Sequence, residues 1–188
     1  DIKPVYIVPV GIKYMYQKDM SGEIEKALTR LEHTVRPENS DAPEDSYHRL
    51  RNVGIALLET LAKEYQLSLS QNSSLNERIE LLREHILSQI EDFMGIVAQS
   101  ESSPLRRVRT IRNQIDDDVY EEGEDVTEYR SEVHKQRLAK IRQFYLDLNR
   151  LINFIAIYDG YVGEKPSQER FLEVIGRLEI EVFGHSKP

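Results

Sequence analysis

The 188-residue chain contains no cysteine, which excludes disulfide bonds, thiolate metal sites and a cysteine nucleophile. It also lacks an apolar run near the ~20 residues that a membrane-spanning helix needs, and no signal peptide is visible. We therefore expect a protein of the cytoplasm, a reducing compartment, that at most lies peripheral to a membrane. Because the chain begins with Asp1 and not with methionine, we expect its start to be a boundary within a longer protein or a processed end.

Recognisable catalytic patterns are missing as well. The nine glycines stand singly, without the Gly-rich spacing of a phosphate-binding loop. The five histidines show neither the H-E-x-x-H pattern nor the paired E-x-x-H motifs of di-iron bundles. The acidic stretch 116–125 lacks the alternating order of a calcium loop. The sequence thus predicts no metal site and no cofactor, and a chain that is not catalytic by itself.

The chain is acidic, with a net charge of −8, which argues against binding to nucleic acid. One local exception is the stretch "PLRRVRTIR", which carries Arg106, Arg107, Arg109 and Arg112 on an amphipathic pattern. These arginines could contact phosphate head groups of a membrane surface or an acidic protein partner. Alternatively, they pair within the chain with the acidic residues that follow at 116–125. Both interpretations stay open from the sequence.

Hydrophobic residues recur at spacings of three and four along most of the chain, which is typical of amphipathic helices. Helices are expected over 19–35, 45–66, 74–97, 104–119, 127–159 and from 167 to about Gly184, with a capping box formed by Ser74 and Glu77. The stretch 4–17 is instead rich in Val, Ile and Tyr and reads as a single strand. The expected fold class is therefore all-α, an antiparallel bundle of about five or six helices preceded by one orphan β-strand.

Two features of this pattern bear on domain organisation. The segment "RPENSDAPEDS" has the composition of a linker and predicts a boundary between residues 1–36 and 44–188. The helix over 127–159 is apolar over a wide arc, which favours a central position in a bundle, although its near-heptad seam also fits a coiled coil.

The opening strand carries the one resemblance to a known family. The phrase "YIVPVGIKYMY" resembles the last block of the phospholipid/glycerol acyltransferase family, with matches at Val8, Pro9, Val10, Ile12, Lys13 and Tyr14. The resemblance covers about the first 17 residues, or 33 with the first helix included, and only Val8, Pro9 and Val10 are carried over as a family motif. The catalytic H-x-x-x-x-D and the phosphate-binding E-G-T-R of that family are absent. The resemblance implies that 1–36 is the end of an acyltransferase-like domain whose catalytic part lies upstream.

Two functions follow as expectations. The first is a non-catalytic helical C-terminal domain, 44–188, of a glycerolipid acyltransferase in phospholipid biosynthesis, which supports stability, membrane docking or partner binding. The alternative is a free-standing helical module for protein interaction, with a homodimer formed through the strand edge or the long helix.

Overall fold

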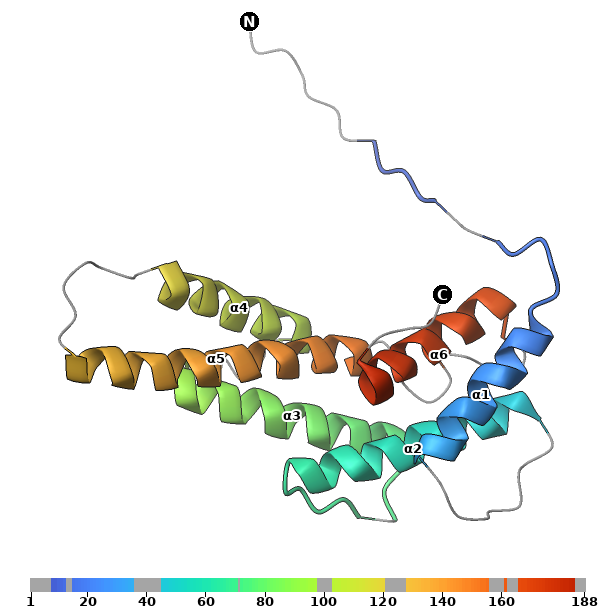
Figure 1. Cartoon of the computed structure of the whole chain (residues 1–188), viewed down its shortest axis with the longest axis horizontal. Helices are drawn as coiled ribbons and strands as arrows, with labels where there is room; N and C mark the ends of the chain where they lie inside the picture. The colour runs from blue at the N-terminus through green and yellow to red at the C-terminus, as the bar shows by residue number, and fades with distance from the viewer. Residues whose placement is uncertain are drawn as a thin grey trace, which may run out of the picture.

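The computed structural model describes residues 8–12, 15–35, 45–70, 72–97, 103–120, 128–155, 161 and 166–184. These residues form six helices (Figure 1): α1 (Ser21–Val35), α2 (Ser46–Glu64), α3 (Leu75–Met94), α4 (Pro104–Tyr120), α5 (Glu128–Ile155) and α6 (Gln168–Phe183). The prediction of an all-helical protein is confirmed for the described residues, and the six helices lie close to the predicted ranges.

The orphan strand is not shown. Residues 8–12 and 15–17, the described part of the predicted strand, have no β-structure, and the rest of 4–17 lies outside the described residues. The physical reason is that no other strand occurs in the described part of the chain, so the backbone groups of this segment have no ladder to join.

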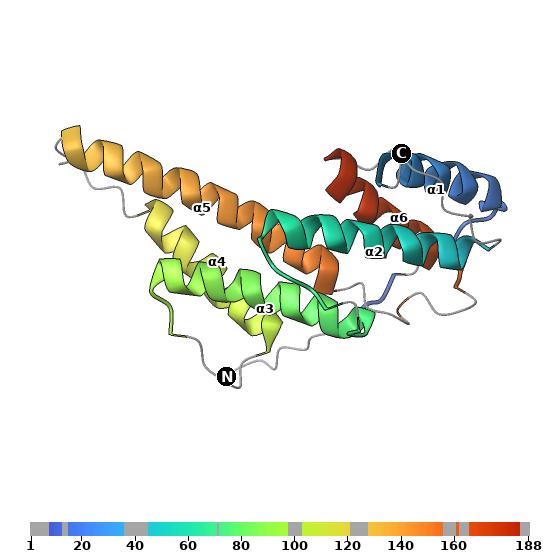
Figure 2. The same ribbon diagram turned by 90° about the horizontal axis from the view of Figure 1, so that it is seen from below.

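The six helices form an elongated bundle with two groups of neighbours (Figures 1 and 2). Helix α1 packs against both α2 and α6 at one end, and α3, α4 and α5 pack against one another at the other end. Contacts between α2 and α3 join the groups, and α5 reaches from one end to α6 (Figure 1). Helix α5 packs against α3 and α4, and Arg150 joins it to α2 and α6, whereas its central position in a bundle stays a prediction.

Apolar side chains from all six helices form one continuous buried cluster. Most positions of the predicted apolar stripes lie in it, and removing such area from water is the main stabilising term of the fold. The side chains that are most completely buried are Leu28, Leu31, Val53, Leu58, Leu61, Ile86, Leu87, Ile90, Ile111, Leu148, Leu151 and Ile175.

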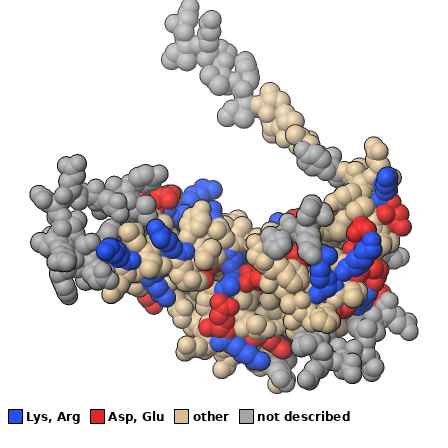
Figure 3. Space-filling model, viewed as in Figure 1, with Lys and Arg blue, Asp and Glu red and all other residues tan. Residues whose placement is uncertain are grey.

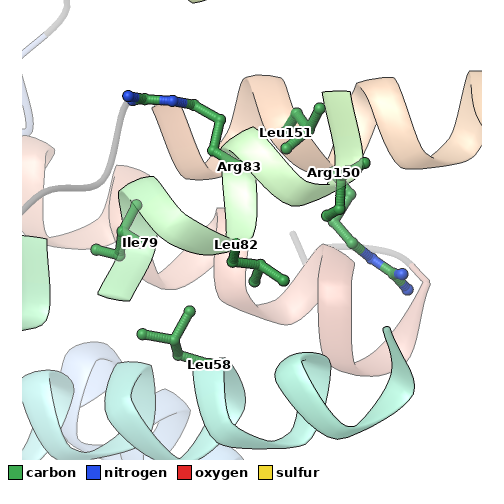
Figure 4. Close-up of a pocket in the computed structure, with 7 residues that line it drawn as sticks. Leu58, Ile79, Leu82, Arg83, Arg150 and Leu151 are labelled. Atoms are coloured by element: carbon green, nitrogen blue, oxygen red, sulfur yellow. The ribbon is translucent and has the colours of Figure 1, made fainter. Parts of the chain in front are cut away.

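A small void of about 10 Å³ lies inside this core between α2, α3 and α5 (Figure 4). Leu58, Ile79 and Leu82 extend towards it, whereas the guanidinium ends of Arg83 and Arg150 point away. This volume holds at most about one water molecule, and the apolar lining offers it too few partners. The void is a packing gap and not a ligand site.

Local capping residues set several helix ends. Ser74 and Glu77 form the predicted capping box of α3, and Ser167 caps α6 by accepting from the backbone N–H of Arg170. Gly95 adopts the left-handed conformation (φ 69°) and ends α3 after Met94. The predicted apolar stripe of this helix, extended to Val97, was therefore too long, and Val97 is 88% exposed.

Helix α1 belongs to residues 1–36, before the predicted domain boundary, but its apolar side chains pack in the same core as those of α2 and α6. Leu28 and Leu31 of α1 are fully buried. Arg49 of α2 donates to the Glu32 carboxylate of α1 at 2.7 and 2.9 Å, and Arg30 of α1 pairs with Glu179 of α6. The division between 1–36 and 44–188 stays a prediction, and an interface at that point would run through this shared core.

Candidate functional site

The densest polar cluster of the described residues lies where α2, α5 and α6 meet. Arg150 of α5 stands at its centre, with Nη1 3.0 Å from Glu64 Oε1 and 2.8 Å from the Tyr65 hydroxyl oxygen, and Nε 2.7 Å from Glu181 Oε1. Asp147, one turn earlier on α5, accepts from the Tyr65 hydroxyl at 2.6 Å. One guanidinium thus joins three helices, and its planar fork of donors suits this task better than an ammonium group would.

Burial and charge shift the pKa values of this cluster. Burial raises the pKa of the Glu181 carboxyl above its ordinary value, and Arg150 opposes that shift. Burial also raises the pKa of the Tyr65 hydroxyl, and the hydrogen bond to the Asp147 carboxylate adds to the effect. Burial disfavours the charged form of Arg150, but Tyr65 and Glu181 outweigh it and raise its pKa. Tyr65 therefore stays protonated and acts as a hydrogen-bond donor, not as a base.

An open hollow of about 470 Å³ adjoins the cluster, between the C-terminal end of α2, α3 and α5. The turn after α2 forms its rim because Gln66 adopts a left-handed conformation (φ 55°), which brings the Tyr65 carbonyl to 3.1 Å from the His85 Nε2. The Asp147 carboxylate within it already accepts from Tyr65 and from the Gln143 amide. The Tyr65 hydroxyl and the Asp147 carboxylate in this hollow are therefore both engaged in hydrogen bonds within the chain.

Metal binding finds no support in the described part of the chain, where no three His, Asp or Glu side chains are grouped so as to hold an ion. Helices long and apolar enough to cross a membrane are likewise missing from the described residues.

The four arginines singled out from the sequence do not share one surface. Arg107 turns towards α3, where it donates to both oxygens of the Glu91 carboxylate at 2.7 and 2.8 Å and also pairs with Glu84. Arg112 turns towards α5, donating to Asn149 Oδ1 at 2.7 Å with its guanidinium 5.6 Å from the centre of the Tyr145 ring. Arg106 and Arg109 are exposed. Two of the four therefore hold helices together, and two are available at the surface.

Val8, Pro9 and Val10, on which the sequence resemblance depends, lie in an exposed segment that precedes α1. Val8, Val10 and Ile12 are 77%, 80% and 75% exposed. The chain that follows is fixed to the start of α6, because the Tyr16 N–H donates to Glu169 Oε1 at 2.9 Å and the Met20 N–H donates to Gln168. These two hydrogen bonds fix the place where the exposed apolar segment 8–12 joins the helical body.

Sequence reasoning missed the Arg150 cluster, whose partners come from positions far apart in the chain, and no local pattern marks it. It also missed the basic residues of α5, for which a signal existed: residues 135–146 contain four basic residues and no acidic one.

No protein-family model, curated protein or solved structure matches the chain.

Proposed function

We propose that this chain is a non-catalytic helical accessory domain of a glycerolipid acyltransferase, attached to the catalytic domain through residues 8–12. The observation that carries the proposal is the exposure of Val8, Val10 and Ile12, three apolar side chains at alternate positions of one segment. Alternation with a period of two is the pattern of a strand that buries one face. An extended segment of this kind gains both backbone hydrogen bonds and apolar burial when it is added to the edge of a sheet.

The remainder of the chain supports the non-catalytic part of the proposal. The motif H-x-x-x-x-D of the acyltransferase family is missing, and the densest polar cluster is saturated by internal hydrogen bonds around Arg150 and Asp147. Such a body is suited to hold and orient a neighbouring domain. The hydrogen bonds from the Tyr16 and Met20 backbone to α6 would fix the direction in which the strand leaves it.

Two experiments test the proposal. The coding sequence upstream of Asp1 is expected to contain H-x-x-x-x-D, and its absence would remove the basis of the family assignment. In the longer protein, Val8→Asp combined with Val10→Asp should expose the junction to proteolysis and reduce acyl transfer to lysophosphatidate. Val97→Asp, at a position that is 88% exposed in a different part of the chain, is the matched control and should change neither property.

A second candidate is a self-associating interaction module, favoured by the same exposed segment, since an unpaired strand can also pair with its own copy. Light scattering on residues 1–188 separates the two. A dimer that Val8→Asp with Val10→Asp dissociates would favour self-association, whereas a monomer would favour attachment to another domain.

A further inference from the structure

Positive charge is strongly segregated on two neighbouring helices. Residues 104–115 of α4 and 135–146 of α5 hold eight of the 25 basic residues of the chain and none of its 33 acidic residues. Helices α4 and α5 pack against each other. In Figure 3, blue side chains gather over these two helices, whereas blue and red are mixed over α1 and α6. These two segments carry a charge of +8, and the remaining 17 basic and 33 acidic residues give the rest of the chain −16.

The contacts of Arg112 show how the outer sides of the two helices are aligned. Arg112 of α4 contacts Tyr145 and Asn149 of α5. The side of α4 that carries Arg112 therefore lies next to the side of α5 that carries Tyr145 and Asn149. On α4, Leu105 and Arg109 lie one turn apart on the side of Arg112, and on α5, Arg142 and Leu146 lie one turn apart on the side of Tyr145 and Asn149. We refer to the surface formed by Leu105, Arg106, Arg109, Arg142, Tyr145 and Leu146 as the α4–α5 face.

This face combines unneutralised charge with exposed apolar groups. Arg106, Arg109 and Arg142 are exposed and form no ion pair with any described residue, in contrast to Arg107 and Arg150. Leu105 and Leu146 are each 61% exposed. Asp116 and Asp117, which follow on α4, are acidic residues with described side chains that border the face.

We propose that the α4–α5 face docks onto a membrane surface rich in anionic phospholipids. Arginine side chains would contact the phosphate groups, while leucine and tyrosine side chains would enter the interface between head groups and acyl chains. A nucleic acid also attracts arginine, but its phosphate backbone has no apolar layer to receive Leu105 and Leu146. The alternation of arginine with leucine therefore favours a lipid surface. The inference goes beyond the proposed function and does not require the upstream domain.

The experiment uses the 188-residue chain and vesicles of phosphatidylcholine, alone or mixed with phosphatidylglycerol. Binding measured by co-sedimentation should require phosphatidylglycerol and weaken as salt is raised. Arg109→Gln combined with Arg142→Gln should lower the partition coefficient by about five-fold for each arginine, since each basic residue at an anionic surface contributes on that scale. Lys18→Gln combined with Lys63→Gln removes the same charge from exposed positions outside the face and should leave binding within about two-fold of the unmodified chain.

The apolar part has its own test. Leu105→Ser combined with Leu146→Ser keeps every charge and should weaken vesicle binding at all salt concentrations, because it removes the contact that salt does not screen. All the substituted positions are exposed, and the three double variants should unfold at the same urea concentration as the unmodified chain. Equal losses in the arginine and lysine variants would overturn the proposal. So would an absence of binding to anionic vesicles, or tight binding to a labelled oligonucleotide in its place.

Discussion

Replacing Arg150 by Met is the sharpest test of how the two ends of the bundle are joined. Methionine retains much of the apolar stem but removes every hydrogen bond to Glu64, Tyr65 and Glu181. The Glu181 carboxylate, only 11% exposed, would then be left without the cation that now lies 2.7 Å away. The variant should therefore fold less stably and lose its link between α2, α5 and α6.

The magnitude follows from the burial of the partners. Removing one member of a buried ion pair costs about 3–5 kcal/mol, because the other charge stays buried. The Arg150 side chain is 21% exposed, so water partly screens the pair, and we expect a loss of about 2–3 kcal/mol. Arg142→Met is the matched control on the same helix. Arg142 is exposed and unpaired among the described residues, so its replacement should stay within about 0.5 kcal/mol.

The loss should also depend on pH in a defined direction. The pKa of the Glu181 carboxyl in the folded state is already raised by burial, and without Arg150 it rises further. A carboxyl with a raised folded pKa destabilises the protein above its unfolded pKa, and this penalty disappears as protonation becomes complete at low pH. The deficit of Arg150→Met relative to the unmodified chain should therefore be smaller at about pH 5 than at about pH 8.

Urea unfolding followed by circular dichroism at both pH values measures these free energies. A double variant, Arg150→Met with Glu181→Gln, removes the stranded charge and should recover part of the loss and abolish most of its pH dependence. The reasoning would be refuted if Arg150→Met and Arg142→Met were equally stable. It would also be refuted if the deficit of Arg150→Met grew towards low pH.

Three further substitutions test the core and the helix ends by the same unfolding measurement. Leu82→Ala, beside the small void, should lower the free energy of unfolding by about 3–4 kcal/mol. Leu81→Ala, on the exposed side of α3, should lower it by less than about 1 kcal/mol, and similar losses in the two variants would contradict the assigned burial. Gly95→Ala should cost about 1–2 kcal/mol because φ is positive there, but Gly54→Ala within α2, where an added Cβ meets nothing, should be neutral or stabilising by up to about 1 kcal/mol. Ser74→Ala should cost about 1 kcal/mol by removing the cap of α3, and no change would show that the capping box is dispensable.

Much of the fold was predictable because its signals are local. The spacing of apolar residues identified all six helices, and the side chains of Ser74 and Ser167 marked two helix starts, since a capping hydroxyl acts on an amide three residues away. The end of α3 was misplaced because Val97 continued the apolar spacing, while Gly95 stops the helix by its backbone conformation. The predicted strand is not seen because strand propensity alone does not form a ladder, and no other strand occurs among the described residues.

The functional surfaces were predictable only in part. An arginine-rich pattern in the sequence shows the charge but not which neighbour each side chain contacts. Because the arginines lie at different angles around α4, Arg107 contacts Glu91, Arg112 contacts Asn149, and Arg109 is exposed at the surface. The sequence by itself determined the helical class, the helix ends that depend on local caps, and the absence of known catalytic motifs. Only the tertiary structure decided that α1 shares a core with α6, that Arg150 joins three helices, and that α4 and α5 present their charges together. Those outcomes depend on residues brought together from distant parts of the chain, and no local interaction encodes them.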